Sequence, residues 1–262
     1  MPPSPSVEIK GFLETSFLDW PGQVASVLFL GGCNFRCPFC HNAGLVLSPD
    51  AFPTLSWDWI KARLSRFKGW LDGVVITGGE PTLHQGLGLL IEEIRGLGLR
   101  IKLDTNGTRP SVLSDLLGQK LLDHVAMDVK APLDDLAYAR AAGRAGYLDL
   151  VKTSLQTLKA SGVPYTLRTT IVPGLHTEDD LLTLAGQLGP HPDWLLQRFQ
   201  PDHALDPALR LEKPMDPDDF QALARRIEDS RLGLTLPAPA PTNSFPSEER
   251  TAMQEVASLV AG

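Results

Sequence analysis

The sequence predicts a single α/β domain built on a parallel sheet, with a barrel or open barrel as the expected architecture. The first observation is length, because 262 residues fit one hydrophobic core of ordinary to large size. The second is the alternation of strand-like and helix-like segments, which is typical of βαβ units. The third is that the strand-like runs are almost continuously apolar, as expected when both faces of a parallel sheet are buried.

Six strand-like runs rich in Val, Ile and Leu follow one another along the chain. They cover residues 24–30, 73–77, 99–105, 124–129, 165–172 and 194–200. Helix-like stretches with apolar residues three and four positions apart lie between them, at residues 56–67, 87–97, 148–160 and 177–188. Gly98, Gly162 and Gly189 stand just past three of these stretches, where glycine commonly ends a helix. Periodicity alone leaves a closed barrel, a partial barrel and a doubly wound sheet open.

The two ends of the chain depart from this pattern. Residues 1–7 are expected to form a flexible tail before a core at residues 8–201, and they lack the charged and apolar regions of a secretory signal. Residues 202–262 form a proline-rich extension, in which two helices are expected at residues 216–230 and 247–260. Residues 237–241 between them have the composition of a stiff linker.

Composition narrows the class of protein. With 43% hydrophobic and 21% charged residues, the chain can bury a core and is not intrinsically disordered. A net charge of −7 argues against nucleic acid as a partner, since phosphate binding needs a basic face. No apolar run approaches the roughly 18 residues of a membrane-spanning helix, so we expect a cytoplasmic protein without a membrane partner.

The strongest chemical signal is the placement of the three cysteines, Cys33, Cys37 and Cys40, which follow the first strand-like run with the spacing CxxxCxxC. Three thiolates on a short loop can hold three corners of an iron–sulfur cubane and leave one iron without a protein ligand, whereas a ferredoxin-type site has four cysteines. His41 directly follows Cys40, so a zinc site with three cysteines and one histidine remains an alternative. Three unrelated buried thiols are the other alternative.

Polar or glycine-rich segments also follow the other strand-like runs. The second run ends in Thr77-Gly78-Gly79-Glu80-Pro81, a tight turn in which glycines permit close backbone approach. Later runs end near Asp104, Asp128, Lys130, Arg168 and Gln200. Each of these alone is compatible with a helix cap or a solvated loop. The carboxyl ends of parallel barrel strands form the active site, however, so their recurrence predicts one shared site.

The cysteine loop, with Phe39 before its last cysteine, resembles that of the radical S-adenosylmethionine (SAM) superfamily. The resemblance implies a [4Fe–4S] cluster ligated by Cys33, Cys37 and Cys40, which are therefore the expected catalytic and metal-binding residues. In that family the amino and carboxylate groups of SAM chelate the open iron, and an electron from the reduced cluster cleaves the sulfonium to a 5′-deoxyadenosyl radical. The cofactors carry this chemistry and the protein positions them.

The same resemblance implies roles for the other candidate residues, as ligands of successive parts of SAM. Phe39 and His41 would border the adenine. Gly78, Gly79 and Glu80 would meet the methionine amino group. The carboxylate, the ribose or a nearby cation would be oriented by Asp104, Asp128, Lys130 and Arg168. Gln200 stands where some members carry a histidine at the adenine.

Within the superfamily the chain is most similar to activating proteins of glycyl-radical enzymes, and particularly to the activating protein of anaerobic ribonucleoside-triphosphate reductase. The similar stretches are residues 17–22, 37–42, 72–82, 102–107, 126–132 and 168–174. This resemblance implies a partial (β/α)6 TIM-type barrel with parallel strands, followed by the proline-rich extension. It also implies an oxidoreductase that abstracts a glycine α-hydrogen from a partner enzyme, with reduced flavodoxin or ferredoxin as electron donor.

Other functions remain open at this stage. The substrate could be a glycyl-radical enzyme of the pyruvate formate-lyase type, or a small molecule, because fold and cofactor motifs do not fix a substrate. A different class is a non-catalytic iron–sulfur or zinc protein. The absence of a fourth cysteine argues against an electron carrier, whose cluster would have only protein ligands.

Overall fold

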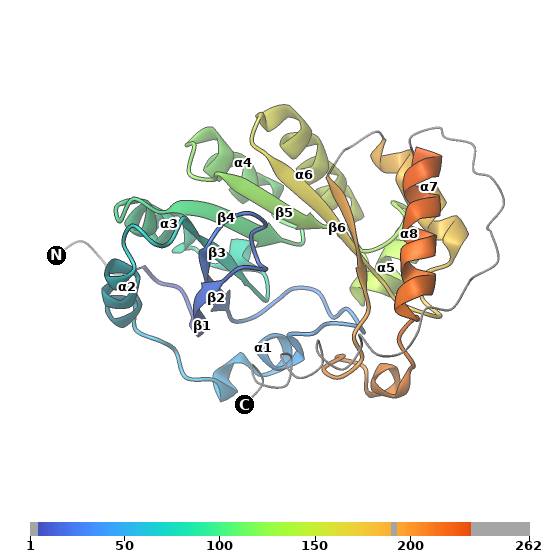
Figure 1. Ribbon diagram of the computed structural model, residues 1–262, viewed down its shortest axis with the longest axis horizontal. Coiled ribbons are helices and arrows are strands. Elements are labelled where there is room, and N and C mark those ends of the chain that lie inside the picture. The colour runs from blue at the N-terminus through green and yellow to red at the C-terminus, as the bar shows by residue number, and fades with distance from the viewer. Residues whose placement is uncertain (1–4, 190–192, 232–262) are drawn as a thin grey trace, which may run out of the picture.

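The computed structural model describes residues 5–189 and 193–231, and its central feature is a seven-stranded sheet in the order β1-β2-β3-β4-β5-β6-β7. The strands are β1 (Ile9–Ser16), β2 (Ala25–Leu30), β3 (Gly73–Gly78), β4 (Arg100–Thr105), β5 (His124–Asp128), β6 (Tyr165–Ile171) and β7 (Trp194–Arg198). Strands β2 to β7 are parallel, and each pairs with the next along the chain. Figure 1 shows the sheet curving, with α3, α4 and α6 along its outer side. The predicted fold, a partial (β/α)6 TIM-type barrel, is confirmed.

Strand β1 is the one strand of the described residues that the sequence does not predict. It pairs antiparallel with β2, and its register shifts between Ile9 and Gly11 and again between Leu13 and Ser16. Such irregularities break the alternation of buried and exposed side chains that marks a strand in a sequence. Gly11 inside the strand weakens the signal further.

The described residues form eight α-helices. They are α1 (Ala43–Leu47), α2 (Trp57–Arg66), α3 (Leu87–Arg95), α4 (Pro110–Gly118), α5 (Asp135–Ala142), α6 (Leu148–Ser161), α7 (Glu178–Leu188) and α8 (Pro217–Arg231). Helices α2, α3, α6, α7 and α8 confirm predicted stretches, although α3 ends two residues early, with Gly96 as its C-cap. The short helices α1, α4 and α5 are not predicted. The expected helix at residues 247–260 and the linker at residues 237–241 lie outside the described residues.

Helix α8 belongs to the C-terminal extension, which starts at residue 202. It packs on α7, where the Arg226 guanidinium donates to both carboxylate oxygens of Glu178 at 2.9 Å. Leu223 and Ile227 of α8 are buried. Helix α8 of the extension is therefore part of the helical layer outside the barrel.

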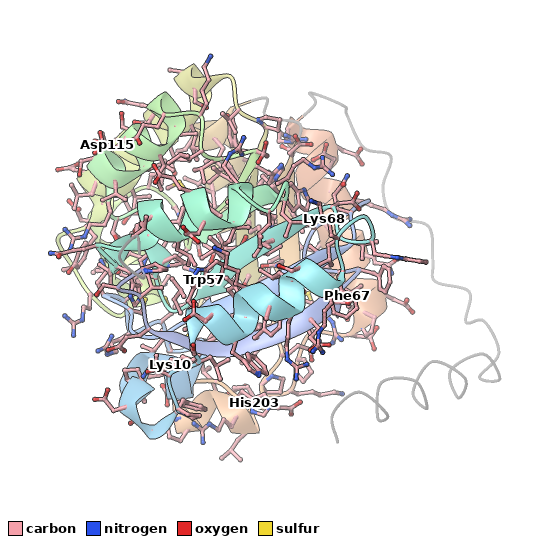
Figure 2. All side chains as sticks on the ribbon, turned by 90° about the vertical axis from the view of Figure 1, so that its left-hand side faces the viewer. Lys10, Trp57, Phe67, Lys68, Asp115 and His203 are labelled. Atoms are coloured by element: carbon pink, nitrogen blue, oxygen red, sulfur yellow. The ribbon has the colours of Figure 1, made fainter. Side chains whose placement is uncertain are left out.

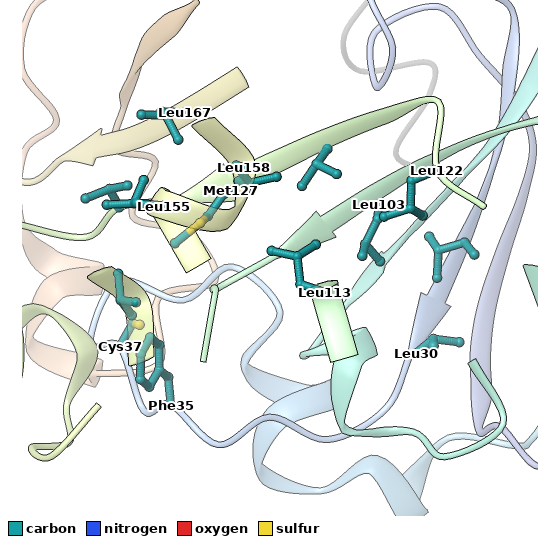
Figure 3. Packing of buried hydrophobic residues seen from close by; sticks show 14 of the residues in the cluster. Leu30, Phe35, Cys37, Leu103, Leu113, Leu122, Met127, Leu155, Leu158 and Leu167 are labelled. Carbon is teal, nitrogen blue, oxygen red and sulfur yellow. The ribbon is translucent and has the colours of Figure 1, made fainter. Parts of the chain in front are cut away.

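The two faces of the sheet have different chemistry. In β4, Ile101 and Leu103 belong to the apolar core between sheet and helices, while Lys102 and Asp104 point to the opposite face because side chains alternate along a strand. Figure 3 shows this core, in which Phe35 and Cys37 of the cysteine loop take part. Figure 2 shows the side covered by α2, which runs from Trp57 toward Phe67. The inner face of the barrel is thus polar at β4 and carries the candidate site.

In residues 5–189 and 193–231, no helix is both long enough and apolar enough to cross a membrane.

Candidate active site

A cavity of about 380 Å³ lies where the parallel strands end, within the roughly 300–1,000 Å³ of small-molecule sites. All predicted site residues except Glu80 and Gln200 line it. They are Cys33, Cys37, Phe39, Cys40, His41, Gly78, Gly79, Asp104, Asp128, Lys130 and Arg168. The recurrence of polar residues at strand ends therefore does reflect one shared pocket.

The cysteine loop, defined here as residues 31–42, is fixed by contacts within itself and with neighbouring segments. The Arg36 guanidinium donates to the carbonyls of Cys33 and Phe35, both at 2.7 Å. The loop is also tied to the end of β3, because the Asn42 amide donates to the Gly78 carbonyl at 2.8 Å. On the other side of the loop, the Asp206 N–H donates to the Pro38 carbonyl at 2.8 Å. The three sulfurs are thus presented by a backbone held from several directions.

Among the three thiols, that of Cys37 is buried and those of Cys33 and Cys40 are partly buried. Burial raises the pKa of Cys33 to about 11 and that of Cys37 to about 12, and it also raises the pKa of Cys40. Metal ions bind thiolates and displace these protons, so loading of the site is coupled to proton release.

The donor set fits an iron–sulfur cubane better than a single ion. In the described part of the chain, no group of three or more His, Cys, Asp or Glu side chains is arranged to hold one metal ion. A mononuclear zinc site needs ligands that converge on one point. A cubane distributes its thiolates over different irons, so three cysteines around one cavity suit it.

A row of alternating charges crosses the inside of the barrel beside the thiols; we call it the charge ladder. Its members are Lys102, Asp104, Arg168, Asp128 and Lys130. Lys102 Nζ lies 2.7 Å from Asp104 Oδ1, and Arg168 Nη1 lies 2.9 Å from Asp104 Oδ2. Arg168 Nε lies 2.8 Å from Asp128 Oδ1, and Lys130 Nζ lies 2.9 Å from Asp128 Oδ2. Strands β4, β5 and β6 each contribute to it.

The ladder holds Asp128, Arg168 and Lys130 in their charged forms. Burial by itself raises the pKa of Asp128, but Arg168 and Lys130 outweigh it and hold that pKa well below the usual range. Burial also disfavours the Arg168 and Lys130 cations, yet the adjacent carboxylates raise both pKa values. Arg168 and Lys130 line the cavity together with Asp104 and Asp128, so the ladder offers both cations and carboxylates to the polar groups of a ligand.

Glu80 and Gln200 lie elsewhere. The Glu80 carboxylate is fully buried and accepts hydrogen bonds from Thr82 N at 3.0 Å, Thr105 Oγ1 at 2.8 Å and Asn106 N at 2.6 Å, as well as from the Thr82 hydroxyl. Burial raises its pKa, and these donors oppose the shift. Glu80 thus holds the end of β4 and the loop after it. Glu80 is not among the residues that line the cavity, although its partners Thr105 and Asn106 are. Gln200 is exposed, and Gln197 lines the cavity in its place.

Comparison with known proteins agrees with this geometry. The family model of the radical SAM superfamily matches residues 27–185. The chain belongs to the radical SAM superfamily. This superfamily uses a [4Fe–4S] cluster and SAM, which confirms the predicted cofactors.

Individual relatives of the superfamily differ in activity. A Methanocaldococcus jannaschii protein, provisionally named a glycyl-radical enzyme activating enzyme, is 32% identical over 202 residues, or 76% of this chain and 82% of the relative. The 7-carboxy-7-deazaguanine synthase of Hyperthermus butylicus is 37% identical over 139 residues, or 50% of this chain and 58% of the synthase. The structure of Streptococcus suis SuiB bound to SAM superposes with a TM-score of 0.57 at 17% identity, covering 76% of this chain and 45% of SuiB. The last similarity shows the fold.

The two glycines of this radical SAM protein are required by the protein's own backbone. Gly78 has a φ of 113°, and a Cβ there would lie 2.4 Å from the backbone of Leu30. A Cβ on Gly79 would lie 1.8 Å from the Gly32 carbonyl oxygen, inside the cysteine loop. The sequence predicts that Gly78 and Gly79 permit close approach of a ligand; the structure shows that they also permit close approach of the end of β3 to residues 30–32.

We expect Gly79→Ala to lower both stability and iron content. The new methyl group collides with Gly32 and must displace the cysteine loop, at a cost of about 1–3 kcal/mol. Iron and sulfide per protein after anaerobic reconstitution, together with urea unfolding, measure the effect. Gly88→Ala is the matched control, because a Cβ on Gly88 meets nothing within 4 Å. Equal iron content in the two variants would contradict this account.

Several lining residues were not predicted as site residues. Asn42 and Asn106 lie beside predicted residues, and only the folded structure shows what their side chains contact. Asp19 comes from the loop between β1 and β2, and its carbonyl accepts a hydrogen bond from Lys102 Nζ at 2.8 Å. The sequence signal that these residues give is their place in the similar stretches at residues 17–22, 37–42 and 102–107.

Proposed function

We propose that this radical SAM enzyme is an activase that abstracts a glycine α-hydrogen from a partner enzyme, anaerobic ribonucleoside-triphosphate reductase in the first instance. The observation that carries the proposal is the single cavity lined by three cysteines and the charge ladder, in a sequence with no fourth cysteine. Such a site has room for an exchangeable ligand at the fourth iron. The similarity to the Methanocaldococcus jannaschii protein supports the activase class.

When bound, the cluster and SAM supply a 5′-deoxyadenosyl radical through one-electron reductive cleavage. In the proposal, Cys33, Cys37 and Cys40 ligate three irons. Gly78 and Gly79 offer backbone groups to the methionine amine at the cavity wall. Glu80 would stabilise this wall indirectly, because its carboxylate accepts hydrogen bonds from Thr105 and Asn106.

The charge ladder would orient the polar groups of SAM. The guanidinium of Arg168 and the ammonium of Lys130 are donors for a carboxylate, and the Asp104 and Asp128 oxygens are acceptors for ribose hydroxyls. Phe39 and His41 line the same cavity and offer ring faces to the adenine. His41 already packs on Phe199, with ring centroids 6.4 Å apart. Because the ladder links three strands, it would hold these groups in fixed relative positions.

The substrate and partners follow from the activase proposal. An open barrel can admit a protein loop, and reduced flavodoxin or ferredoxin would deliver the electron in the cytoplasm, without nucleic acid or membrane. Residues 8–201 would carry the chemistry, and the extension from residue 202 would cover one side. The second candidate is a small-molecule radical SAM enzyme, favoured by the 37% identity to 7-carboxy-7-deazaguanine synthase. An activase of the pyruvate formate-lyase type is the nearest variant of the proposal.

Anaerobic reconstitution with iron and sulfide, followed by dithionite and SAM, tests the chemistry. We expect 5′-deoxyadenosine and methionine by chromatography, and an EPR signal of the reduced cluster that SAM perturbs. Reconstituted protein is then mixed with the reductase or with pyruvate formate-lyase, and EPR detects the glycyl radical. A radical on the reductase alone supports the proposal as stated. SAM cleavage without a glycyl radical on either partner would favour the small-molecule candidate, and a colourless protein holding one zinc would refute the mechanism.

A further inference from the structure

Asn106 connects the loop after β4 to the sulfur of Cys33. Its side chain is 5% exposed, and its Nδ2 lies 3.7 Å from Cys33 Sγ and 2.9 Å from Asn34 Oδ1. An amide nitrogen carries two hydrogens, so one can bind Asn34 while the other faces the sulfur. The backbone N–H of Asn106 is held separately, by Glu80 Oε2 at 2.6 Å.

The orientation of the Asn106 amide is fixed by its other end. Its Oδ1 accepts from the backbone N–H of Thr108 at 3.0 Å and from the Thr108 hydroxyl at 2.7 Å. A backbone N–H can only donate, so the group facing it must be the amide oxygen. The amide nitrogen therefore points to Asn34 and Cys33. Asn34 Nδ2 closes the network by donating to Thr108 Oγ1 at 2.7 Å.

The environment makes this contact more effective than a surface contact would be. Cys33 receives a second donor, the backbone N–H of Phe35 at 3.4 Å. Both Asn106 and Thr108 are buried, and hydrogen bonds gain strength where water is excluded. Donors to cluster sulfurs are one of the means by which proteins set cluster potentials.

We propose that Asn106 is a positioning residue whose N–H···S hydrogen bond to Cys33 raises the reduction potential of the cluster. This inference rests on the ligand role of Cys33 in the proposed function. The reduced cluster carries one more negative charge, which is shared with its thiolates, so a donor to sulfur stabilises the reduced state more than the oxidised state. Loss of the donor makes reduction by the same electron donor less favourable.

The test is an EPR-monitored redox titration of reconstituted full-length protein in the absence of SAM. We expect Asn106→Ala to lower the equilibrium constant for reduction about tenfold, which is 59 mV for a one-electron couple. Ser154→Ala is the matched control. Ser154 of α6 is buried and anchors the same loop by donating to the Gly107 carbonyl at 2.7 Å, without reaching a sulfur. Its potential should equal that of the wild type.

Two further variants keep the test decisive. Asn106→Asp retains the acceptor for Thr108 but replaces the donor with a negative oxygen, so its potential should fall below that of Asn106→Ala. If the Asn106 variants do not fold, Thr108→Val removes the hydroxyl that donates to the amide oxygen and accepts from Asn34, while the backbone N–H of residue 108 still holds that oxygen. This weaker hold on the amide should lower the potential by a smaller amount. An unchanged potential at wild-type iron content, or an equal shift in Ser154→Ala, overturns the inference. A wild-type protein that takes up no cluster refutes the proposed function itself, so the two failures are distinguishable.

Discussion

Replacing Arg168 with leucine should lower the free energy of unfolding by about 3 kcal/mol, the low end of what breaking a buried ion pair costs. The guanidinium lies between Asp104 and Asp128, at 2.9 and 2.8 Å, and its side chain is 18% exposed. Leucine leaves two carboxylates facing an apolar side chain. The decrease in the free energy of unfolding stays near this lower value because Asp104 is still paired with Lys102, and Asp128 with Lys130.

Urea unfolding of the full-length protein measures this effect, and two variants serve as controls. Arg168→Lys keeps the charge and loses the forked geometry, so it should lie between wild type and Arg168→Leu. Arg226→Leu removes another arginine that binds a carboxylate through two nitrogens. This pair with Glu178 lies on the surface, where the two side chains are 39% and 43% exposed. It should cost at most about 1 kcal/mol. Equal losses at Arg168 and Arg226 would contradict a buried ladder.

The same comparison has a pH dependence of defined sign. Burial raises the native pKa of Asp128. Arg168 and Lys130 outweigh burial and hold this pKa below its usual range. The stabilisation of the folded state by this carboxylate is therefore fully present above its unfolded pKa of about 3.9. It is lost as the pH falls toward the lower native value. The difference between wild type and Arg168→Leu should be largest near neutrality and shrink below about pH 4. A difference independent of pH would indicate lost packing in place of lost charge pairing.

The fold was predictable to the extent that each element is local in the sequence. A parallel sheet buries both faces of its strands, so the apolar runs at residues 73–77 and 124–129 reveal β3 and β5 without any tertiary information. Strand β1 is stabilised by its pairing with β2, and its shifted register leaves no regular pattern to read. The five residues of α1 span little more than one turn, too short for a helical period to emerge.

The candidate site divides along the same line. The cysteine spacing is local, and the meeting of Asp104 and Asp128 at strand ends follows from parallel topology, with Arg168 in the middle of β6 beside them. The direction in which a side chain points cannot be predicted in this way, because it depends on partners far along the chain. The Glu80 carboxylate binds the last residue of β4 and the first residue after it, through donors 25 and 26 positions away, as well as its near neighbour Thr82. The approach of Asn106 to Cys33 spans 73 positions, and no sequence pattern encodes it.

Cys37→Ala should abolish both the cluster and SAM cleavage while leaving the protein folded. Cys37 is 6% exposed and packs in the apolar core with Phe35, so alanine removes one sulfur from a site that otherwise remains intact. A cubane held by two thiolates has lost a third of its protein ligands, and the sequence offers no other cysteine to replace it. Iron, sulfide and 5′-deoxyadenosine should all fall to background.

The control for Cys37→Ala must lose buried atoms without losing a ligand. Val172→Ala does so, since Val172 is fully buried and lies outside the cavity lining. Both variants should unfold cooperatively in urea at reduced midpoints, but only Val172→Ala should remain brown after reconstitution. A brown, active Cys37→Ala protein would show that the irons are held elsewhere. If instead both variants lost the cluster, the site would be sensitive to core packing in general. Iron binding in Cys37→Ser, which replaces the sulfur with an oxygen at nearly unchanged side-chain size, would then decide the assignment of Cys37.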